Sequence, residues 1–95
     1  MAAPQAGTIT FEIRGPLGRE DLPQLYERVC RLLALSRPAL AFCEVAGVSA
    51  DAIALEALAR LALVARRRGC AVKLRGASPA LLELVAFAGL EGVLV

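Results

Sequence analysis

The sequence contains no histidine and no tryptophan, and it has two aspartates and one lysine among 95 residues. Histidine is the side chain that most often transfers protons near neutral pH, so its absence removes the usual catalytic acid and base. Among the remaining carboxylates, only Glu44 is predicted to lie near Asp51. These absences argue against an enzyme and leave a small metabolic enzyme as a weak alternative.

Long hydrophobic runs are also missing, because no stretch approaches the ~20 apolar residues of a membrane-spanning helix. The hydrophobic fraction of 58% must therefore serve a core or a partner surface rather than direct membrane insertion. The first residues lack the basic and apolar parts of a signal peptide. We interpret residues 1–7 as a disordered leader and residues 8–95 as a single domain, located in the cytoplasm.

Cysteines and aromatics are few, and neither group forms a recognisable binding motif. Cys30, Cys43 and Cys70 are odd in number, far apart and set in apolar runs, which favours reduced core thiols over disulfides or metal ligands. All four aromatics fall on predicted core faces: Phe11, Tyr26, Phe42 and Phe87. We therefore expect no cofactor, no metal and no stacking platform for nucleic acid.

The positive charge is modest, with a net charge of +2. Its densest part is the run 66–68, three arginines in the last turn of a predicted helix. Cations there oppose the negative end of the helix dipole. We prefer this structural role to nucleic-acid contact.

The apolar periodicity predicts seven alternating elements. Strict alternation marks the first strand, and an apolar run at residues 39–45 predicts a central strand buried on both faces. Ser78 and Pro79 are expected to begin the last helix, and Gly89 to end it. The predicted strands are 8–14, 39–45, 70–75 and 93–95, and the predicted helices are 20–35, 51–68 and 78–89. This β-α-β-α-β-α-β order predicts an α/β fold, a small mainly parallel sheet with helices packed on it.

The turn before the second helix occupies the place where open α/β sheets usually carry function. Ser49 or Asp51 can cap that helix by accepting its free N–H groups, and a cap alone is the simpler interpretation of either residue. The turn contains no glycine-rich phosphate cradle. Nucleotide binding at this helix N-terminus therefore stays a weak alternative.

The second helix has apolar residues beyond its core stripe. Helical spacing puts Ala54, Leu58, Leu61 and Ala65 on the inner face, and Glu56, Arg60 and Arg67 on the outer face. Leu55, Ala59 and Leu63, with Ala52 nearby, form an apolar strip beside the charged ridge. A neighbouring helix could cover this strip, or it could be a partner or homodimer face.

The order of elements and several local sequences resemble the STAS domain family, over roughly residues 8–95. Family members typically have Asp-Ser-Ser-Gly-Leu opening a helix rich in Ala, Leu and Arg, then an Arg-x-x-Gly end and a Ser-Pro helix closing on Gly-Leu. Here the matching stretches are 51–55, 66–69, 77–79 and 88–91. The last of these is the strongest match, and it is shared by many STAS domains.

In anti-sigma factor antagonists of this family, a partner serine kinase phosphorylates the serine after the helix-opening aspartate, which breaks the complex. Alignment on Asp51 places Ala52 at that serine, so the resemblance implies a domain without this switch. The loop before Asp51 is one residue shorter than usual. Ser49 is therefore a displaced phosphosite at most.

The resemblance implies a non-catalytic protein-interaction module that docks an anti-sigma factor or a related serine-kinase-type regulator. The alternative is a STAS subunit of a lipid-transport ABC assembly that binds its ATPase or permease. The residues expected to contact a partner lie in the turn and on the outer side of the second helix: Val48, Ser49, Asp51, Ala52, Ile53, Leu55, Glu56, Ala59, Arg60, Leu63 and Arg67.

Overall fold

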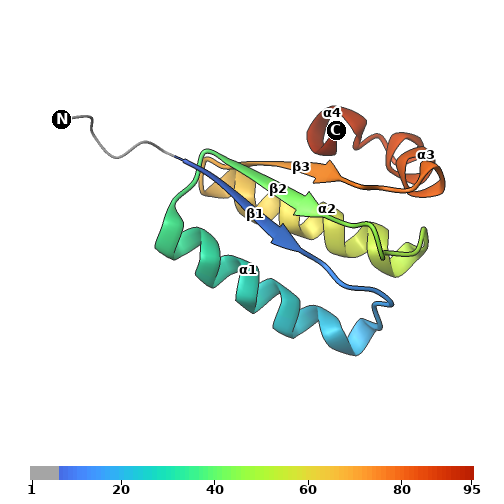
Figure 1. Cartoon of the computed structure of the whole chain (residues 1–95), viewed down its shortest axis with the longest axis horizontal. Coiled ribbons are helices and arrows are strands. Elements are labelled where there is room, and N and C mark those ends of the chain that lie inside the picture. The colour runs from blue at the N-terminus through green and yellow to red at the C-terminus, as the bar shows by residue number, and fades with distance from the viewer. Residues whose placement is uncertain (1–6) are drawn as a thin grey trace.

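A computed structural model of the chain describes residues 7–95. The expected leader lies outside these residues except for Gly7, which is exposed. Figure 1 shows the strands and the helices that follow them. In chain order the elements are β1 (Thr8–Glu12), the 3-10 helix η1 (Arg19–Asp21), α1 (Leu22–Ser36), β2 (Leu40–Glu44), α2 (Ala52–Arg67), β3 (Ala71–Arg75), α3 (Pro79–Phe87) and α4 (Glu91–Leu94).

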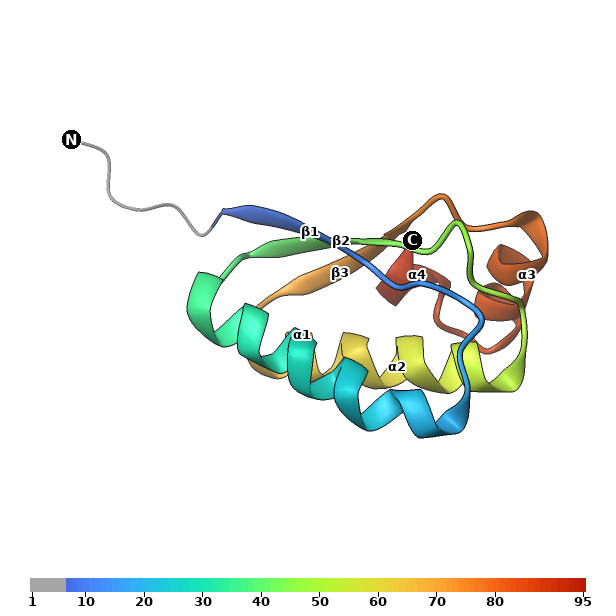
Figure 2. The same ribbon diagram turned by 60° about the horizontal axis from the view of Figure 1, so that its bottom comes forward.

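The three strands form one parallel sheet in the order β1-β2-β3. Cys43 in the centre lies opposite Phe11 of β1 and Leu74 of β3. The crossover helices α1 and α2 lie side by side on the same face of this sheet (Figure 2). The predicted α/β class, the parallel pairing and the central position of β2 are thus confirmed.

The prediction that the central strand is buried on both faces is wrong. Ala41, Cys43 and Val45 point toward the helices and are fully buried, whereas Phe42 and Glu44 on the other face are only half-buried. Helices α1 and α2 cover a single face, which leaves the other side of β2 accessible. The run suggests burial on both faces because Leu40 and Phe42 are apolar, and Glu44 at the end of the strand is the one polar residue on the open face.

The core lies between the sheet and the two crossover helices. The predicted inner face of α2 is confirmed, because Ala54, Leu58, Leu61 and Ala65 are at most 1% exposed. Each fully buried leucine of this kind stabilises the fold by roughly 1.5–3 kcal/mol. This packing fixes which side of α2 remains accessible.

Side-chain and glycine caps define the helix ends as expected. The Leu81 N–H donates to Ser78 Oγ over 3.1 Å, and Pro79 occupies the first turn of α3. Gly69 and Gly89 follow α2 and α3 with φ of 75° and 80°, a conformation in which a β-carbon is unfavourable.

The predicted terminal strand at residues 93–95 is wrong, because this segment belongs to the helical turn α4. The Leu94 and Val95 N–H groups donate to the carbonyls four residues earlier, over 2.9 and 3.0 Å. The turn brings Leu94 to 0% exposure and sets α4 against β3. Burial of this leucine overrides the strand preference of two valines in so short a segment.

Candidate protein-docking surface

The turn between β2 and α2 has one buried residue, Val48, and exposed residues on its outer side. The Val48 N–H donates to the Val45 carbonyl over 3.0 Å, and the Val48 side chain is 5% exposed. Ser49 and Asp51 are exposed, and the Asp51 N–H donates to the Ser49 carbonyl over 3.1 Å. Among the expected partner-contact residues, Val48 therefore supports the turn from the core side.

Asp51 is the N-cap of α2. Its backbone is extended, and its Oδ1 atom accepts a hydrogen bond from the Ala54 N–H over 2.8 Å. The next residue, Ala52, begins the helix and is exposed. A hydroxyl at position 52 would thus be open to a kinase, but a methyl group stands there instead.

The first loop of the chain presses against this turn. A β-carbon built on Gly15 would lie 2.0 Å from the Gly47 carbonyl oxygen and 3.2 Å from the Val48 Cα. Only glycine allows this backbone approach. The loop after β1 therefore holds the turn after β2 in place.

Two charged residues of α2 are already engaged with the N-terminal part of the fold. Glu56 accepts a hydrogen bond from the Arg19 guanidinium over 2.8 Å, and the Arg60 guanidinium lies 5.5 Å from the centre of the Tyr26 ring. Burial, and next the Glu56 carboxylate, raise the pKa of Tyr26. An exposed ion pair such as Arg19–Glu56 contributes about 0–1 kcal/mol, so it adds little to the stability of the fold.

The middle of α2 carries the apolar strip expected from its sequence. Leu63 is 49% exposed, Ala52 is exposed, and Leu55 and Ala59 are half-buried. Ile53 is also half-buried and packs against the core. No helix within residues 7–95 covers Leu63, whereas Leu55 contributes partly to the fold. The accessible strip is therefore centred on Leu63, and exposed Arg67 lies one turn further on.

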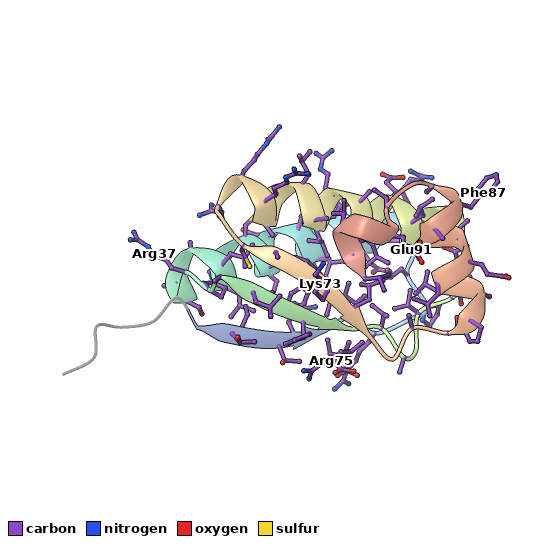
Figure 3. The ribbon with its side chains drawn as sticks, turned by 90° about the horizontal axis from the view of Figure 1, so that it is seen from above. Arg37, Lys73, Arg75, Phe87 and Glu91 are labelled. Atoms are coloured by element: carbon purple, nitrogen blue, oxygen red, sulfur yellow. The ribbon has the colours of Figure 1, made fainter. Side chains whose placement is uncertain are left out.

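An apolar feature that the sequence did not reveal lies beside the turn, on α3. Phe87, predicted to face the core, is 90% exposed, and Figure 3 shows its ring extending away from the ribbon. A hollow lies between α3 and the turn. It is lined by Ala50, Ala80, Glu83, Leu84, Ala86 and Phe87. Because α3 reads Pro-Ala-Leu-Leu-Glu-Leu-Val-Ala-Phe, nearly every position is apolar and periodicity cannot select its buried side.

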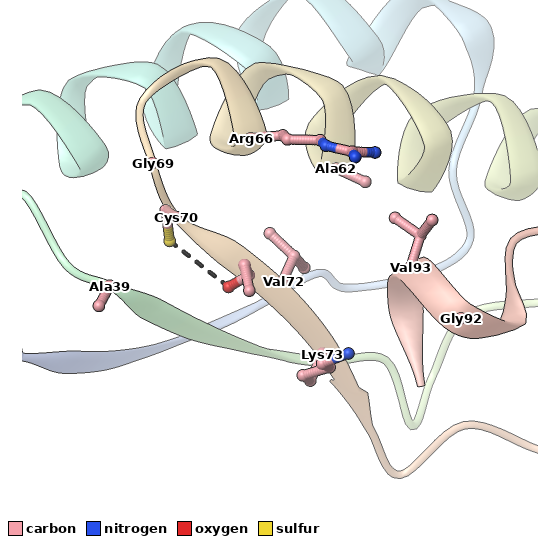
Figure 4. Close-up of a pocket in the computed structure, with 10 residues that line it drawn as sticks. Ala39, Ala62, Arg66, Gly69, Cys70, Val72, Lys73, Gly92 and Val93 are labelled. Atoms are coloured by element: carbon pink, nitrogen blue, oxygen red, sulfur yellow. Dashed lines mark hydrogen bonds between the residues drawn. The ribbon is translucent and has the colours of Figure 1, made fainter.

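A second hollow, between α2, β3 and α4, is lined by few groups that could take part in a reaction (Figure 4). Small apolar residues form most of its lining, and its cationic groups are Arg66 and Lys73. The Lys73 ammonium donates to the Val95 carbonyl over 3.1 Å. No histidine exists to serve as a base there, and no carboxylate lines this hollow.

The three cysteines match the expectation of free thiols. Cys43 and Cys70 are buried and Cys30 is half-buried. Burial raises the pKa of the Cys43 thiol to about 12, with a further contribution from the Glu44 carboxylate, and burial also raises that of Cys70. From Gly7 to the C-terminus, no group of histidine, cysteine or acidic side chains is arranged to hold a metal ion.

Hydropathy along the helices is also informative. Across the described part of the chain, none of the helices combines the length and the apolar character required to cross a bilayer.

Fold and surface together define a class of protein, an α/β domain with an accessible helix face. A family model described as "Mlab, STAS domain" matches residues 2–95, and the chain belongs to this STAS family. STAS domains are generally non-catalytic and mediate protein–protein interactions. No curated protein sequence matches the chain.

Proposed function

We propose that this chain docks a partner protein through the turn at residues 48–53 and the outer face of α2, without a serine phospho-switch. The single observation that carries this proposal is the exposed helix start at Asp51 and Ala52, continuous with half-exposed Leu63. The same face in the family's signalling members meets a serine-kinase-type anti-sigma factor. We propose a regulator of this type as the partner and the cytoplasm as the place of action.

In this proposal the chain acts only by binding its partner, because no residue of the turn supplies a chemical step. The Leu63 side chain gives up its remaining contact with water on docking, and Arg67 at the border favours an acidic rim on the partner. The hollow beside Phe87 extends the accessible apolar area from the turn at Ala50 to α3. A partner that covers both would bury the largest exposed aromatic of the described chain.

Ala52 makes the docked state independent of phosphorylation at that position. A phosphate on the family's serine adds about two negative charges at the helix start, where it disrupts the contact. Alanine has no acceptor hydroxyl, so release depends on abundance or on another residue. Ser49 is the one hydroxyl in the turn, and we propose that it is unmodified.

Co-purification with quantitative mass spectrometry tests the docking face. The wild-type chain is compared with Leu63→Glu and with Leu82→Glu, a control at an exposed leucine on α3 (39% exposed) that does not line the hollow. We expect the specific partner to be lost from Leu63→Glu alone. Equal recovery with all three chains would sink the assignment of α2.

Incubation with the purified partner and Mg-ATP tests the unswitched state. We expect the intact mass to remain unchanged while the complex persists. Stoichiometric addition of phosphate at Ser49, followed by dissociation, would overturn this part of the proposal and establish a displaced switch.

The second candidate is a STAS subunit of a lipid-transport ABC assembly, in which the same face grips an ATPase or a permease. The observation that favours it is the methyl group at position 52, because a permanently assembled subunit needs no phosphate-controlled release. The identity of the co-purified protein separates the two: a kinase-like regulator supports signalling, and a transporter ATPase or permease supports transport. Self-association through Leu63 would instead appear as a dimer that Leu63→Glu dissociates.

A further inference from the structure

The outer edge of β1 carries backbone groups that face away from the sheet. The Ile13 N–H donates to the Glu44 carbonyl over 3.0 Å, so Ile9, Phe11 and Ile13 direct their backbone groups toward β2. Because successive residues of a strand direct their backbone N–H and C=O groups to opposite sides, the groups of Thr8, Thr10 and Glu12 point outward. Within residues 7–95, β1 pairs with β2 alone. An exposed strand edge of this kind is a template for another strand.

An apolar groove runs directly beneath this edge. It encloses about 370 Å³ between β1 and the outer side of α1 and is lined by Phe11, Glu12, Arg28, Val29, Arg31, Leu32 and Leu35. Leu35 at its end is 80% exposed, the highest value among the exposed leucines of the described chain. A strand added to β1 would point every second side chain into this groove.

We propose that the β1 edge and the groove beneath it bind an extended peptide segment of a partner protein. The unpaired groups of Thr8 and Thr10 select an extended backbone, because only another strand satisfies them in register. The groove selects apolar side chains at alternate positions. Arg28 in its lining selects an acidic residue beside the apolar ones. Arg31 is already paired with Glu27 at 3.6 Å, but this pair is exposed and contributes only about 0–1 kcal/mol, so an acidic residue of the segment can replace Glu27 at little cost.

Charge argues against a second copy of this chain as the occupant. An antiparallel β1–β1 pair would place two α1 helices together beneath the joined edge, as the position of α1 under β1 indicates (Figure 2). Arg28 and Arg31 of one copy would then face the same arginines of the other. A single peptide strand brings no helix and no further arginines, and it can place an acidic residue beside Arg28.

One existing contact must open for the segment to pair along the whole strand. The Arg28 guanidinium donates to the Glu12 carbonyl over 3.2 Å and so occupies the outward acceptor at the end of β1. Both groups are exposed, so replacing the Arg28 donor at the Glu12 carbonyl by a backbone N–H of the peptide changes the free energy little. This surface involves β1 and α1 and is independent of the proposed docking face on α2.

The probe is a synthetic peptide of alternating valine and threonine with an aspartate pair at each end, titrated into the 15N-labelled full chain by NMR. A second peptide, N-methylated on one edge of its backbone, is the matched control. We expect the first peptide to shift the amides of Thr8, Thr10 and Glu12 and to slow their hydrogen exchange. The methylated peptide lacks the donors for pairing and should bind at least about tenfold more weakly.

Two variants separate the edge from the groove. Thr10→Pro removes an outward N–H without removing a hydrogen bond to β2, so the fold should persist while peptide affinity falls about tenfold. Thr10→Val keeps the N–H and should bind like the wild type. Leu35→Gln, at a site that is already exposed, should weaken binding severalfold.

Each outcome decides the proposal. Saturable binding that Thr10→Pro weakens about tenfold and Thr10→Val preserves supports it. No amide shift at millimolar peptide, or equal binding of the methylated peptide, overturns it. A concentration-dependent dimer through β1 would assign the edge to a second copy, and tighter binding after deletion of residues 2–6 would assign it to the chain's own N-terminus; both contradict the proposal. None of these results bears on the α2 surface.

Discussion

Replacement of Gly15 by alanine is the sharpest perturbation that the structure offers. The new β-carbon would lie 2.0 Å from the Gly47 carbonyl oxygen, whereas real β-carbons essentially never come within 3.0 Å of such an atom. Both partners are backbone, so rotation of a side chain cannot relieve the clash. The loop after β1 and the turn after β2 must separate by about 1 Å or more, which is an overpacking defect.

The expected cost follows from this displacement. Overpacking of this kind destabilises a domain by about 1–3 kcal/mol. In a domain of this size each kcal/mol lowers the melting temperature by about 4–8 °C, so Gly15→Ala should melt roughly 5–20 °C below the wild type. Circular dichroism during heating measures this shift, and urea titration gives the free energy of unfolding independently.

Gly47→Ala is the matched control on the other side of the same contact. Its β-carbon would meet only the Gly15 nitrogen, at an ordinary 3.8 Å. We expect it to leave the melting temperature unchanged or to raise it slightly, because alanine restricts the unfolded chain by about 0.4–1 kcal/mol. If both variants melt within about 2 °C of each other, the reasoning from close backbone approach is refuted.

Three further predictions concern single side chains. Asp51→Ala removes the N-cap of α2 and should cost about 1 kcal/mol by urea unfolding, whereas Asp51→Asn should cost less; equal losses would contradict the capping role. Phe87→Ser should change the free energy of unfolding by less than about 0.5 kcal/mol, because the ring is already exposed, and a large loss would place it in the core. Burial raises the pKa of Cys43 to about 12 from 9.0. The buried neutral thiol therefore makes its full contribution to the free energy of unfolding below about pH 9, and this contribution declines as the pH rises toward 12. Alkylation at pH 8 should therefore modify half-buried Cys30 before Cys43, and the reverse order would contradict the burial of Cys43.

Much of the fold could be predicted from the sequence because local signals and the global pattern agree. Ser78 and Asp51 are side-chain caps whose hydrogen bonds form as expected, and the inner face of α2 is set by helical spacing. The central strand was identified from its apolar run. The sequence does not predict that only one face of this strand is covered, because that depends on both crossover helices lying on the same side of the sheet.

The remaining errors share a physical cause, which is apolar sequence without periodicity. In α3 nearly every residue is apolar, so the outward direction of Phe87 depends on how the helix packs rather than on its pattern. The terminal valines suit a strand, yet burial of Leu94 makes the segment a helical turn. The groove beneath β1 joins residues of two elements, and no local signal in either one indicates it.

Burial refines the candidate docking surface that helical spacing predicts, and its role in docking stays a prediction. The half-exposed Leu63 and the exposed Ala52 lie where helical spacing put them, while Val48 supports the turn from within. Phe87 enlarges the surface toward α3.

The most direct test of the docking face is site-specific photo-crosslinking. A benzophenone amino acid replaces Leu63 in one chain and Leu82 in another, and each chain is irradiated with the co-purified partner. We predict a covalent complex from position 63 and none from position 82. Crosslinking from position 82 alone, or from neither position while the complex remains intact, would contradict the claim that the outer face of α2 binds the partner.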